Sequence, residues 1–360
     1  MTKERILRYA VYAAGVVSLA VFIVTKSEVL LNSVTRDMFS NGDLYRFARV
    51  EAFKTPVPPT TCQKAPVIDG DIGNAEVIVV GDSYMETCRG HERFSVQLAE
   101  SLDTDVAAVY AGRKEEYFDP VYLYWKNHLG TDRKRIVLLE RIERYIMNQY
   151  SVRRDEDTAT FQEIAQSAER SFLDTLRDRW FTKAEKNYGI FFSSSNLTAP
   201  VVETWNTLRF NLFGRISDET PVYSLHPPFL FFKDEVLSSK RTSYYYPHPD
   251  SLVCSIADNI AAIHDELQLR CHAELVFMPI PNAYTLYHGF VNNDPYDSFL
   301  PRLCARLEER GVRTIDLYER FRDSREILYL PTDSHWNTAG VHLAVDQAVR
   351  LLSRMRENPM

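Results

Sequence analysis

Two short polar motifs, far apart in the chain, carry the residue types that acyl-transfer chemistry requires. A Gly-Asp-Ser sequence ending at Ser83 follows the apolar run Val77–Val80, and an Asp-Ser-His sequence runs from Asp333 to His335. A serine on a strand-to-helix turn exposes its hydroxyl, and the first helix amides can stabilise developing negative charge. The second motif supplies an imidazole to take the serine proton and a carboxylate to orient that imidazole. Together the motifs predict a catalytic triad of Ser83, His335 and Asp333.

Each of these residues also has an interpretation without chemistry. Ser83 could simply cap the N-terminus of a helix, and His335 could be a hydrogen-bonded histidine of the core. The joint occurrence of the two motifs, at the expected ends of one fold, favours the triad. Tyr84 and Trp336, which directly follow the serine and the histidine, are candidate substrate-binding residues.

The elements that must position these residues alternate between strands and helices. Short β-rich runs bounded by polar turns predict strands at Glu76–Val80, Val106–Tyr110, Arg135–Leu139, Ala273–Met278 and Thr314–Leu317. Helical stretches are predicted at Glu92–Leu102, Leu252–Leu269, Tyr296–Arg310 and Thr338–Met355. This alternation predicts an α/β fold, a three-layer α/β/α domain with a parallel sheet.

The N-terminus carries a candidate membrane anchor. Three basic residues among the first eight precede an apolar run from Tyr9 to Thr25, which is about the minimum length for spanning a bilayer. No convincing small-x-small cleavage site follows the run. We therefore expect an uncleaved transmembrane helix over residues 1–26, with a cleaved signal peptide as the alternative. The basic residues before the run predict a cytoplasmic N-terminus and an exported body.

The remaining chain divides into a stem, a linker and a larger domain. Residues 27–74 form the predicted stem and Pro-rich linker. A mostly helical stem over Ser27–Lys54 is followed by a stiff linker at Thr55–Thr61, because consecutive prolines cannot continue a helix. The catalytic domain is predicted over residues 75–355, with an insertion at about 148–249 that lacks strand–helix alternation. Such an insertion is expected over the carboxyl edge of the sheet, where α/β folds bind ligands. Its Tyr244–Tyr246 sequence could stack on sugars, but packing against the core is favoured.

Composition limits the possible partners. The chain has 360 residues and a net charge of −7, which gives no electrostatic footprint for nucleic acid. Its five cysteines leave at least one thiol unpaired, and Cys254 and Cys271 stand at the two ends of one predicted helix, too far apart to bridge. The spacing of cysteines and histidines does not resemble a metal site. We therefore expect no metal and no cofactor.

These motifs resemble those of the SGNH (GDSL-type) hydrolase superfamily. The closer likeness is to the branch containing alginate O-acetyltransferase-like and DHHW proteins of bacterial exopolysaccharide pathways, because Asp333 stands two residues before His335 and Trp336 follows. Further matching stretches are Asn41–Tyr45, Arg135–Tyr145, Leu275–Tyr287 and Gly311–Leu317. The serine precedes the Asp-x-His motif here, as in standard GDSL enzymes, whereas the alginate enzymes have the reverse order.

The resemblance implies an acyl-serine mechanism with an oxyanion hole. Gly112 stands where the superfamily's second-block glycine would donate its amide, and the Ser83 amide would be the other donor. The Gly-x-Asn-Asp block that normally supplies a third donor is not found. Arg144 is a candidate for that role, and the alternative is a structural salt bridge from Arg144 to Glu140 or Glu143.

The resemblance also implies a function and a location. It predicts a membrane-anchored, serine-dependent O-acyltransferase, with acetyl as the expected group and an exported polysaccharide as the acceptor. A multi-spanning membrane acyltransferase would supply the acyl donor. The body would lie on the periplasmic or extracytoplasmic side of a bacterial inner membrane. Two alternatives stay open: a membrane-tethered carbohydrate or lipid esterase with the same triad, and a non-catalytic polysaccharide-binding or assembly protein that kept the fold.

Overall fold

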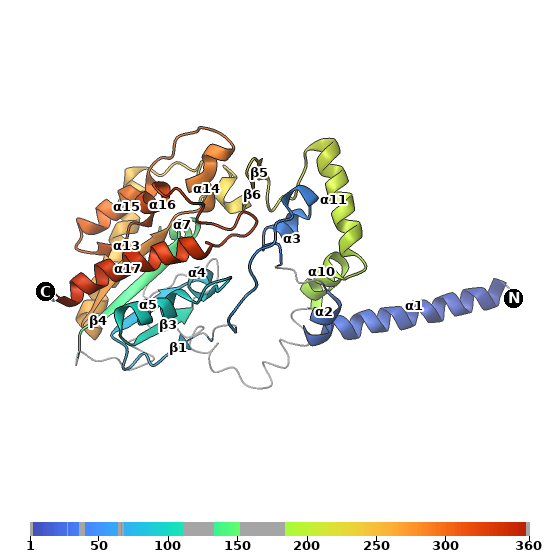
Figure 1. The fold of residues 1–360 in the computed structure, drawn as a ribbon, viewed down its shortest axis with the longest axis horizontal. Coiled ribbons are helices and arrows are strands. Elements are labelled where there is room, and N and C mark those ends of the chain that lie inside the picture. The colour runs from blue at the N-terminus through green and yellow to red at the C-terminus, as the bar shows by residue number, and fades with distance from the viewer. Residues whose placement is uncertain are drawn as a thin grey trace.

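A six-stranded sheet forms the centre of the molecule (Figure 1). The computed structural model describes residues 3–26, 28–35, 40–63, 66, 68–110, 133–151 and 184–357. The strands, in chain order, are β1 (Ile68–Asp69), β2 (Val77–Gly81), β3 (Val106–Tyr110), β4 (Arg135–Ile142), β7 (Ala273–Ile280) and β8 (Arg313–Thr314). They lie in the order β1-β3-β2-β4-β7-β8, and every neighbouring pair is parallel except β1 and β3.

The order of the parallel strands places a switch point beside the serine motif. Numbered along the chain without β1, these strands lie in the order 2-1-3-4-5, which is that of a flavodoxin-like doubly wound sheet. The winding direction changes between β2 and β4, and folds of this kind bind ligands outside the carboxyl ends of the strands at that point. Because β2 ends at Gly81, Ser83 stands directly at this location.

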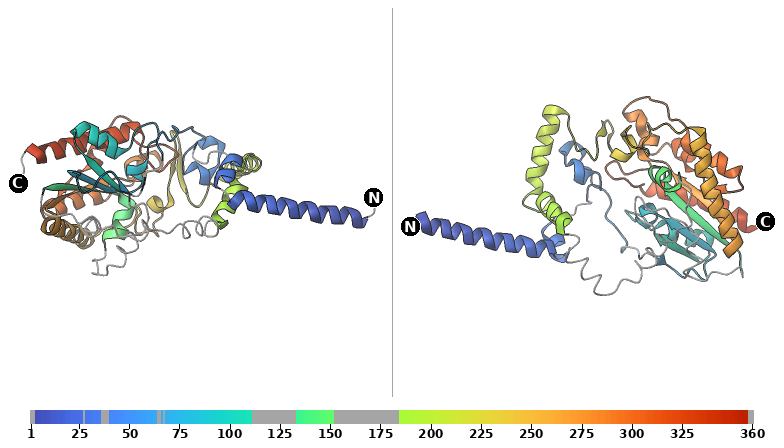
Figure 2. Two further views of the ribbon diagram at one scale, coloured as in Figure 1. Left: turned by 90° about the horizontal axis from the view of Figure 1, so that it is seen from below. Right: turned by 180° about the vertical axis from the view of Figure 1, so that it is seen from behind.

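Helices cover both faces of the sheet, which confirms the predicted α/β/α architecture (Figures 1 and 2). In β2, Val77 and Val79 belong to one hydrophobic core, and Ile78 and Val80 belong to another, because successive side chains point to opposite faces. The first core includes residues of α5 (Phe94–Leu102), α16 (Leu317–Arg322) and α17 (Thr338–Glu357). The second includes residues of α7 (Glu143–Tyr150), α13 (Asp250–Cys271) and α15 (Phe299–Glu308).

Some predicted boundaries need correction. The strand predicted to end at Leu139 continues to Ile142, since it stays paired with β7 as far as Ile280. The predicted strand Thr314–Leu317 is shorter, because Asp316 caps α16 by accepting a hydrogen bond from a backbone amide of that helix. The short antiparallel strand β1 was not predicted, since two residues carry too little pattern to be recognised.

The N-terminal segment contains an extended apolar helix and a stem. Helix α1 (Lys3–Lys26) is long and apolar enough to cross a membrane, is unburied along its apolar window, and points away from the body (Figures 1 and 2). The stem contains α2 (Glu28–Val34), α3 (Tyr45–Ala48) and the short 3₁₀ helix Glu51–Phe53. Stem residues including Leu44 and Phe53 form a separate hydrophobic cluster with Leu230 and Phe232. The later stem is therefore packed on the protein and is not a free spacer.

The described part of the insertion contributes to the core as well as to the periphery. It consists of α10 (Ala184–Ser194), α11 (Ala199–Phe213), the hairpin of β5 (Val222–Leu225) and β6 (Pro228–Phe231), and α12 (Lys233–Val236). Phe229, Phe231 and Tyr244 are buried in the first core, as the favoured interpretation expects, whereas Tyr245 is 37% exposed. Residues 152–183 of the predicted insertion lie outside the described part of the chain.

Candidate active site

Ser83, His335 and Asp333 form a continuous chain of hydrogen-bond contacts at the carboxyl end of β2. His335 Nε2 lies 3.0 Å from Ser83 Oγ, and His335 Nδ1 lies 2.6 Å from Asp333 Oδ1. Asp333 is fully buried, whereas Ser83 and His335 are partly exposed. A hydroxyl, an imidazole and a carboxylate in this sequence can move the serine proton onto the imidazole. The structure thus brings together the three residues that the motifs single out.

The turn that carries Ser83 is held by the buried carboxylate of Glu140. Helix α4 (Ser83–Glu86) begins after Asp82, whose side chain caps it by accepting a hydrogen bond from the Tyr84 amide at 3.0 Å. Glu140, on the neighbouring strand β4, accepts a hydrogen bond from the Asp82 amide at 2.8 Å. A Cβ at Gly81 would lie 2.6 Å from the Glu140 carboxylate, so only glycine permits this approach. Burial, followed by the charge of Asp82, raises the pKa of Glu140.

Burial and charge pairing shift the pKa values of His335 and Asp333 in opposite directions. For His335, burial disfavours the imidazolium, but the hydrogen bond and charge of Asp333, aided by Asp43, raise its pKa above the ordinary value. For Asp333, burial favours the neutral acid, but the contacts with His335 and the charge of Arg89 lower its pKa. Burial and the charge of Asp333 raise the pKa of Asp43. The site therefore favours a carboxylate that stabilises a protonated imidazole.

Two residues that sequence reasoning did not assign to the site, Arg89 and Asp43, hold the Asp333 segment. Arg89 Nη1 lies 3.0 Å from Asp333 Oδ2, and the Asp43 amide donates to the same oxygen at 2.9 Å. In return, the Asp43 carboxylate accepts hydrogen bonds from the Ser334 amide at 2.7 Å and from the Ser334 hydroxyl at 2.6 Å. The segment Asn41–Tyr45 carried a signal through the family resemblance, but nothing in the sequence placed it beside the triad.

Gly42 explains why the stem can reach the site. Its φ of +94° lies in the region that favours glycine, and a Cβ there would stand 2.0 Å from the Thr332 carbonyl oxygen. The amides of Leu44 and Tyr45 both donate to that oxygen at 3.1 Å. The stem is therefore seated directly on the backbone that precedes Asp333.

A disulfide holds the loop that presents Arg89. Cys62, which directly follows the linker, is bonded to Cys88, and the Thr61 amide donates to the Cys88 carbonyl at 3.0 Å. The linker is thus fastened to the loop on which Arg89 stands. The other three cysteines are unpaired, and Cys254 and Cys271 lie on one helix, as the sequence predicted.

The structure assigns other surroundings to the remaining predicted residues. Arg144 forms a buried ion pair with Glu235 through Nη1 at 2.9 Å, so its ion-pair partner is Glu235, whereas the predicted partners were Glu140 and Glu143. Tyr84 and Trp336 are fully buried in the main core, which corrects their assignment as substrate-binding residues because neither offers surface to a ligand.

The predicted oxyanion donor Gly112 lies outside the described residues.

A cluster of potential metal ligands overlaps the triad. One donor atom from each of Asp43, Asp333 and His335 lies within 4.8 Å of the others. However, both oxygens of Asp333 already accept hydrogen bonds, and one of them faces the Arg89 guanidinium. A cation bound there would be repelled by that guanidinium and would replace those donors. These contacts fit a hydrogen-bonded network better than a metal centre.

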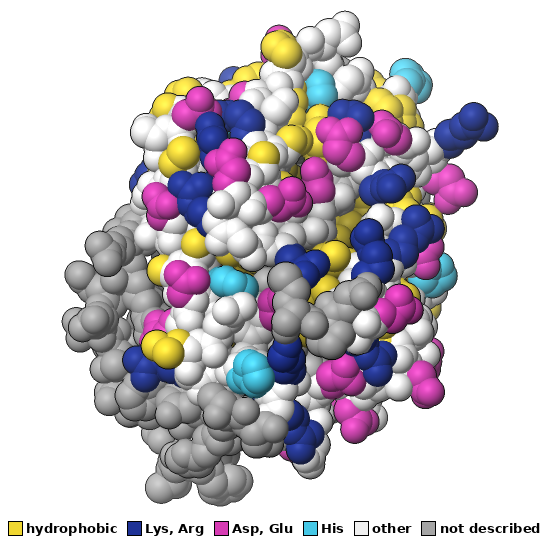
Figure 3. Space-filling view, turned by 90° about the vertical axis from the view of Figure 1, so that its left-hand side faces the viewer, with side chains coloured by type: hydrophobic (Ala, Val, Ile, Leu, Met, Phe, Trp, Pro, Cys, Tyr) yellow, Lys and Arg dark blue, Asp and Glu magenta, His cyan; other side chains and the backbone are white. Residues whose placement is uncertain are grey.

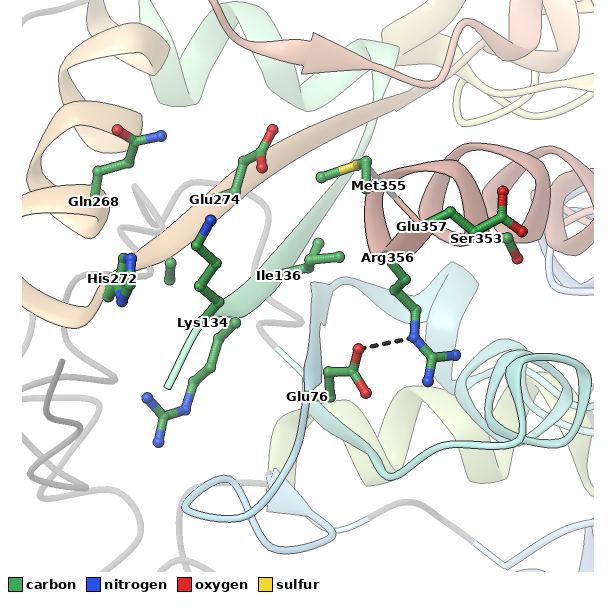
Figure 4. Close-up of a pocket in the computed structure, with 12 residues that line it drawn as sticks. Glu76, Lys134, Ile136, Gln268, His272, Glu274, Ser353, Met355, Arg356 and Glu357 are labelled. Carbon is green, nitrogen blue, oxygen red and sulfur yellow. Dashed lines mark ion pairs between the residues drawn. The ribbon is translucent and has the colours of Figure 1, made fainter. Parts of the chain in front are cut away.

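A cavity of about 840 Å³ lies at the other end of the sheet, beside the amino ends of β4 and β7 (Figure 4). Its lining includes Glu76, Lys134, Glu274 and Arg356, and Glu76 pairs with Arg356 at 2.8 Å. Figure 3 shows that acidic and basic side chains are interspersed over this end of the molecule. Since ligands in doubly wound folds bind at the carboxyl ends, the cavity does not mark the site of the proposed chemistry.

A doubly wound sheet with a serine on the turn at its switch point is the arrangement expected of an SGNH-like α/β domain. Consistent with this class, residues 230–358 match the family described as "SGNH hydrolase-like domain, acetyltransferase AlgX". The match confirms the resemblance to the alginate O-acetyltransferase-like branch and supports an acetyltransferase-like function. It includes Asp333 and His335 but not Ser83. No curated protein and no solved structure matches the chain.

Proposed function

We propose that the protein is a serine-dependent O-acyltransferase with Ser83 as nucleophile. The observation that carries this proposal is the contact chain from Ser83 Oγ through the His335 imidazole to Asp333. Ser83 Oγ attacks the acyl carbonyl while its proton passes to His335 Nε2, and Asp333 stabilises the resulting imidazolium. The imidazolium then protonates the leaving group, which departs and leaves an acyl-serine. An acceptor hydroxyl loses its proton to His335 as it attacks the acyl-serine. The imidazolium then returns a proton to Ser83 Oγ as the Oγ–acyl bond breaks, which restores the free serine and the neutral imidazole.

The tetrahedral intermediates need donors for their oxyanion. We assign this role to the backbone amide of Ser83, at the start of α4, together with the amide of Gly112. Arg144 stays the candidate third donor, because its ion pair with Glu235 uses Nη1 and its buried Nε has no hydrogen-bond partner within the described residues.

The acyl group and acceptor follow from the family match and the anchor. The matched family is described as an acetyltransferase, which supports acetyl as the transferred group. The exposed apolar helix α1 supports attachment to a bacterial inner membrane, and the Cys62–Cys88 disulfide supports a body on its periplasmic side. An enzyme at that location suits an exported polysaccharide as acceptor and a multi-spanning membrane acyltransferase as the source of the acyl donor.

The same residues could also release the acyl group to water, which would make the protein an esterase. The order of the motifs, with serine before Asp-x-His, is that of standard GDSL enzymes and keeps this second function open. The two functions differ only in the acceptor that resolves the acyl-serine. They share a dependence on the Ser83 hydroxyl, which a purely structural protein of this fold would lack.

The test uses the full-length chain in detergent with p-nitrophenyl acetate, with and without a panel of exopolysaccharide oligomers. We expect an acetyl group on Ser83, detected by mass spectrometry of the peptide that contains it. We also expect acetylated oligomer with the wild-type chain and none with Ser83→Ala. Ser353→Ala, at the opposite end of the sheet, is the matched control and should retain activity. Free acetate that is insensitive to every oligomer, with no oligomer gaining mass, would favour the esterase. Unchanged acetate release by Ser83→Ala would contradict both functions.

A further inference from the structure

Helix α11 has one face that is attached to the stem. Glu203 forms an ion pair with Lys54. Thr207 Oγ1 accepts a hydrogen bond from a stem amide at 3.0 Å, and Asn206 Nδ2 donates to a stem carbonyl at 3.1 Å. The ring of Phe210 lies edge-on to an aromatic ring of the stem, with centroids 5.7 Å apart. These residues recur at helical spacing, so they define the side of α11 that faces the protein.

The opposite face of α11 is apolar and exposed. Its residues, which we call the apolar stripe, are Val201 (68% exposed), Trp205 (59%), Leu208 (47%) and Leu212 (64%). Their spacing of four, three and four residues places them in one row, turned away from the stem. Leu197 and Phe213 extend the exposed apolar surface at its two ends. A row of this kind on a water-soluble surface indicates a contact that the isolated chain does not make.

The helix is also fastened to the end of the candidate anchor. Helix α10, which leads into α11, contacts α1 and α2, and Asn187 Nδ2 donates to the carbonyl of Thr25 at 2.8 Å. The Asn196 amide, just before α11, donates to the carbonyl of Val34 at 2.9 Å. Helix α11 runs crosswise to α1, on the side of the body from which α1 extends (Figures 1 and 2). If α1 crosses a bilayer, α11 must lie close to the surface of that bilayer.

We propose that the apolar stripe of α11 lies in the membrane interface, as a second contact beside the anchor. The proposal rests on the membrane anchoring proposed above and identifies the partner as lipid. A crosswise helix that buries leucine and tryptophan side chains at the level of the headgroups is typical of interfacial helices. Tryptophan favours this depth because its ring is apolar and its N–H remains hydrated. Arg209, beside the stripe, is the one basic residue of α11 and can reach lipid phosphates.

This contact would fix the orientation of the catalytic domain. A single transmembrane helix leaves the body free to rotate and tilt above the bilayer. A second contact on a helix that is bonded to the stem removes most of this freedom, because the same stem reaches the triad through Asp43. The stripe would thereby hold the site at a constant height and direction relative to the membrane.

The test uses the full-length chain reconstituted into phosphatidylglycerol-containing vesicles with brominated acyl chains. Since the chain has four tryptophans, the emission of Trp205 is taken as the difference between the wild-type chain and Trp205→Phe. We expect this difference emission to fall by about half or more in brominated relative to unbrominated vesicles. The double variant Leu208→Glu/Leu212→Glu should lose most of that quenching while still floating with the vesicles through α1. Leu269→Glu, which changes an exposed leucine on α13, is the matched control and should leave it unchanged.

The outcomes separate the stripe from the anchor and from catalysis. A chain that floats with vesicles but whose Trp205 is quenched only by aqueous iodide would overturn the lipid contact and reassign the stripe to a protein partner. Quenching that persists in the double variant would overturn it as well. A chain that does not float at all would remove both the anchoring and the contact. None of these results depends on acyl transfer, so the proposed reaction stands or falls separately.

Discussion

The two ends of the parallel sheet hold charged residues in different ways. At the carboxyl ends, Asp333 is fully buried and receives hydrogen bonds or ion pairs from His335, Arg89 and the Asp43 amide. At the amino ends, most charged residues of the 840 Å³ cavity are at least partly exposed, and the pair of Glu76 and Arg356 is open to solvent. This cavity therefore lies where the charges are less constrained than at the triad.

This difference indicates which end is organised for chemistry. Burying a carboxylate is costly unless several donors compensate it, so a buried and fully bonded acid requires a specific arrangement around it. An exposed ion pair contributes little and requires no such arrangement. The size of a cavity is accordingly a weaker guide to function here than the number of bonds made by a buried charge.

The largest expected effect is the loss of the nucleophile or the base. Ser83→Ala and His335→Ala should each reduce acyl transfer by about a thousandfold or more, since the two groups act as a unit. For the same reason, the double variant should be little worse than either single variant. Initial rates with p-nitrophenyl acetate would measure this, with circular dichroism to check folding. Losses that simply multiply in the double variant would argue against a shared proton transfer.

A smaller effect is expected from Asp43, which would act as a positioning residue. Asp43→Asn should reduce kcat by roughly tenfold to a hundredfold, the size typical of groups that orient a site residue. The charge of Asp43 contributes to the raised pKa of His335, and only the neutral imidazole can accept the serine proton. Removing that charge lowers the pKa of His335, so the acidic limb of the kcat/KM profile should move to lower pH.

The pH profile distinguishes this role from simple structural damage. Asp71→Asn, which changes an exposed acid in a turn before β2, is the matched control and should leave the limb in place. A slower Asp43→Asn enzyme with an unshifted limb would show that Asp43 supports the fold without acting on His335.

The disulfide should affect stability more than chemistry. Replacing Cys62 and Cys88 by serine removes a cross-link across 26 residues, which corresponds to roughly 3 kcal/mol of unfolding free energy. Activity should fall only several-fold, through loosening of the loop that presents Arg89 to Asp333. Denaturant melts and rates at a temperature well below unfolding would separate the two effects. Cys254→Ser serves as the control, and equal stability of the two variants would contradict the structural role.

Sequence patterns predicted those parts that depend on local periodicity. The strand before Ser83 and the helix after His335 were predicted from apolar runs and turn residues. The two motifs were recognised because their residue types suit acyl transfer. The support around Asp333 could not be predicted, since Arg89 and Asp43 reach it through tertiary folding from separate segments. Tyr84 and Trp336 were assigned to substrate by their position beside the motifs. Their burial shows that both side chains face the core, although each follows a triad residue in the sequence.

The smallest effect is expected at the cavity on the amino ends of the strands. Glu76→Gln breaks the ion pair with Arg356. Because the Glu76 side chain is 40% exposed and that of Arg356 is 34% exposed, the free energy of unfolding should change by about 1 kcal/mol or less. Acyl transfer should not change, because the cavity and Ser83 lie at opposite ends of the sheet. The measurement is the unfolding free energy together with kcat and KM for the acyl donor and the oligomer acceptor. A raised KM in Glu76→Gln, with unchanged stability, would mean that a substrate occupies this cavity, and the contrast between the two ends of the sheet would then have to be abandoned.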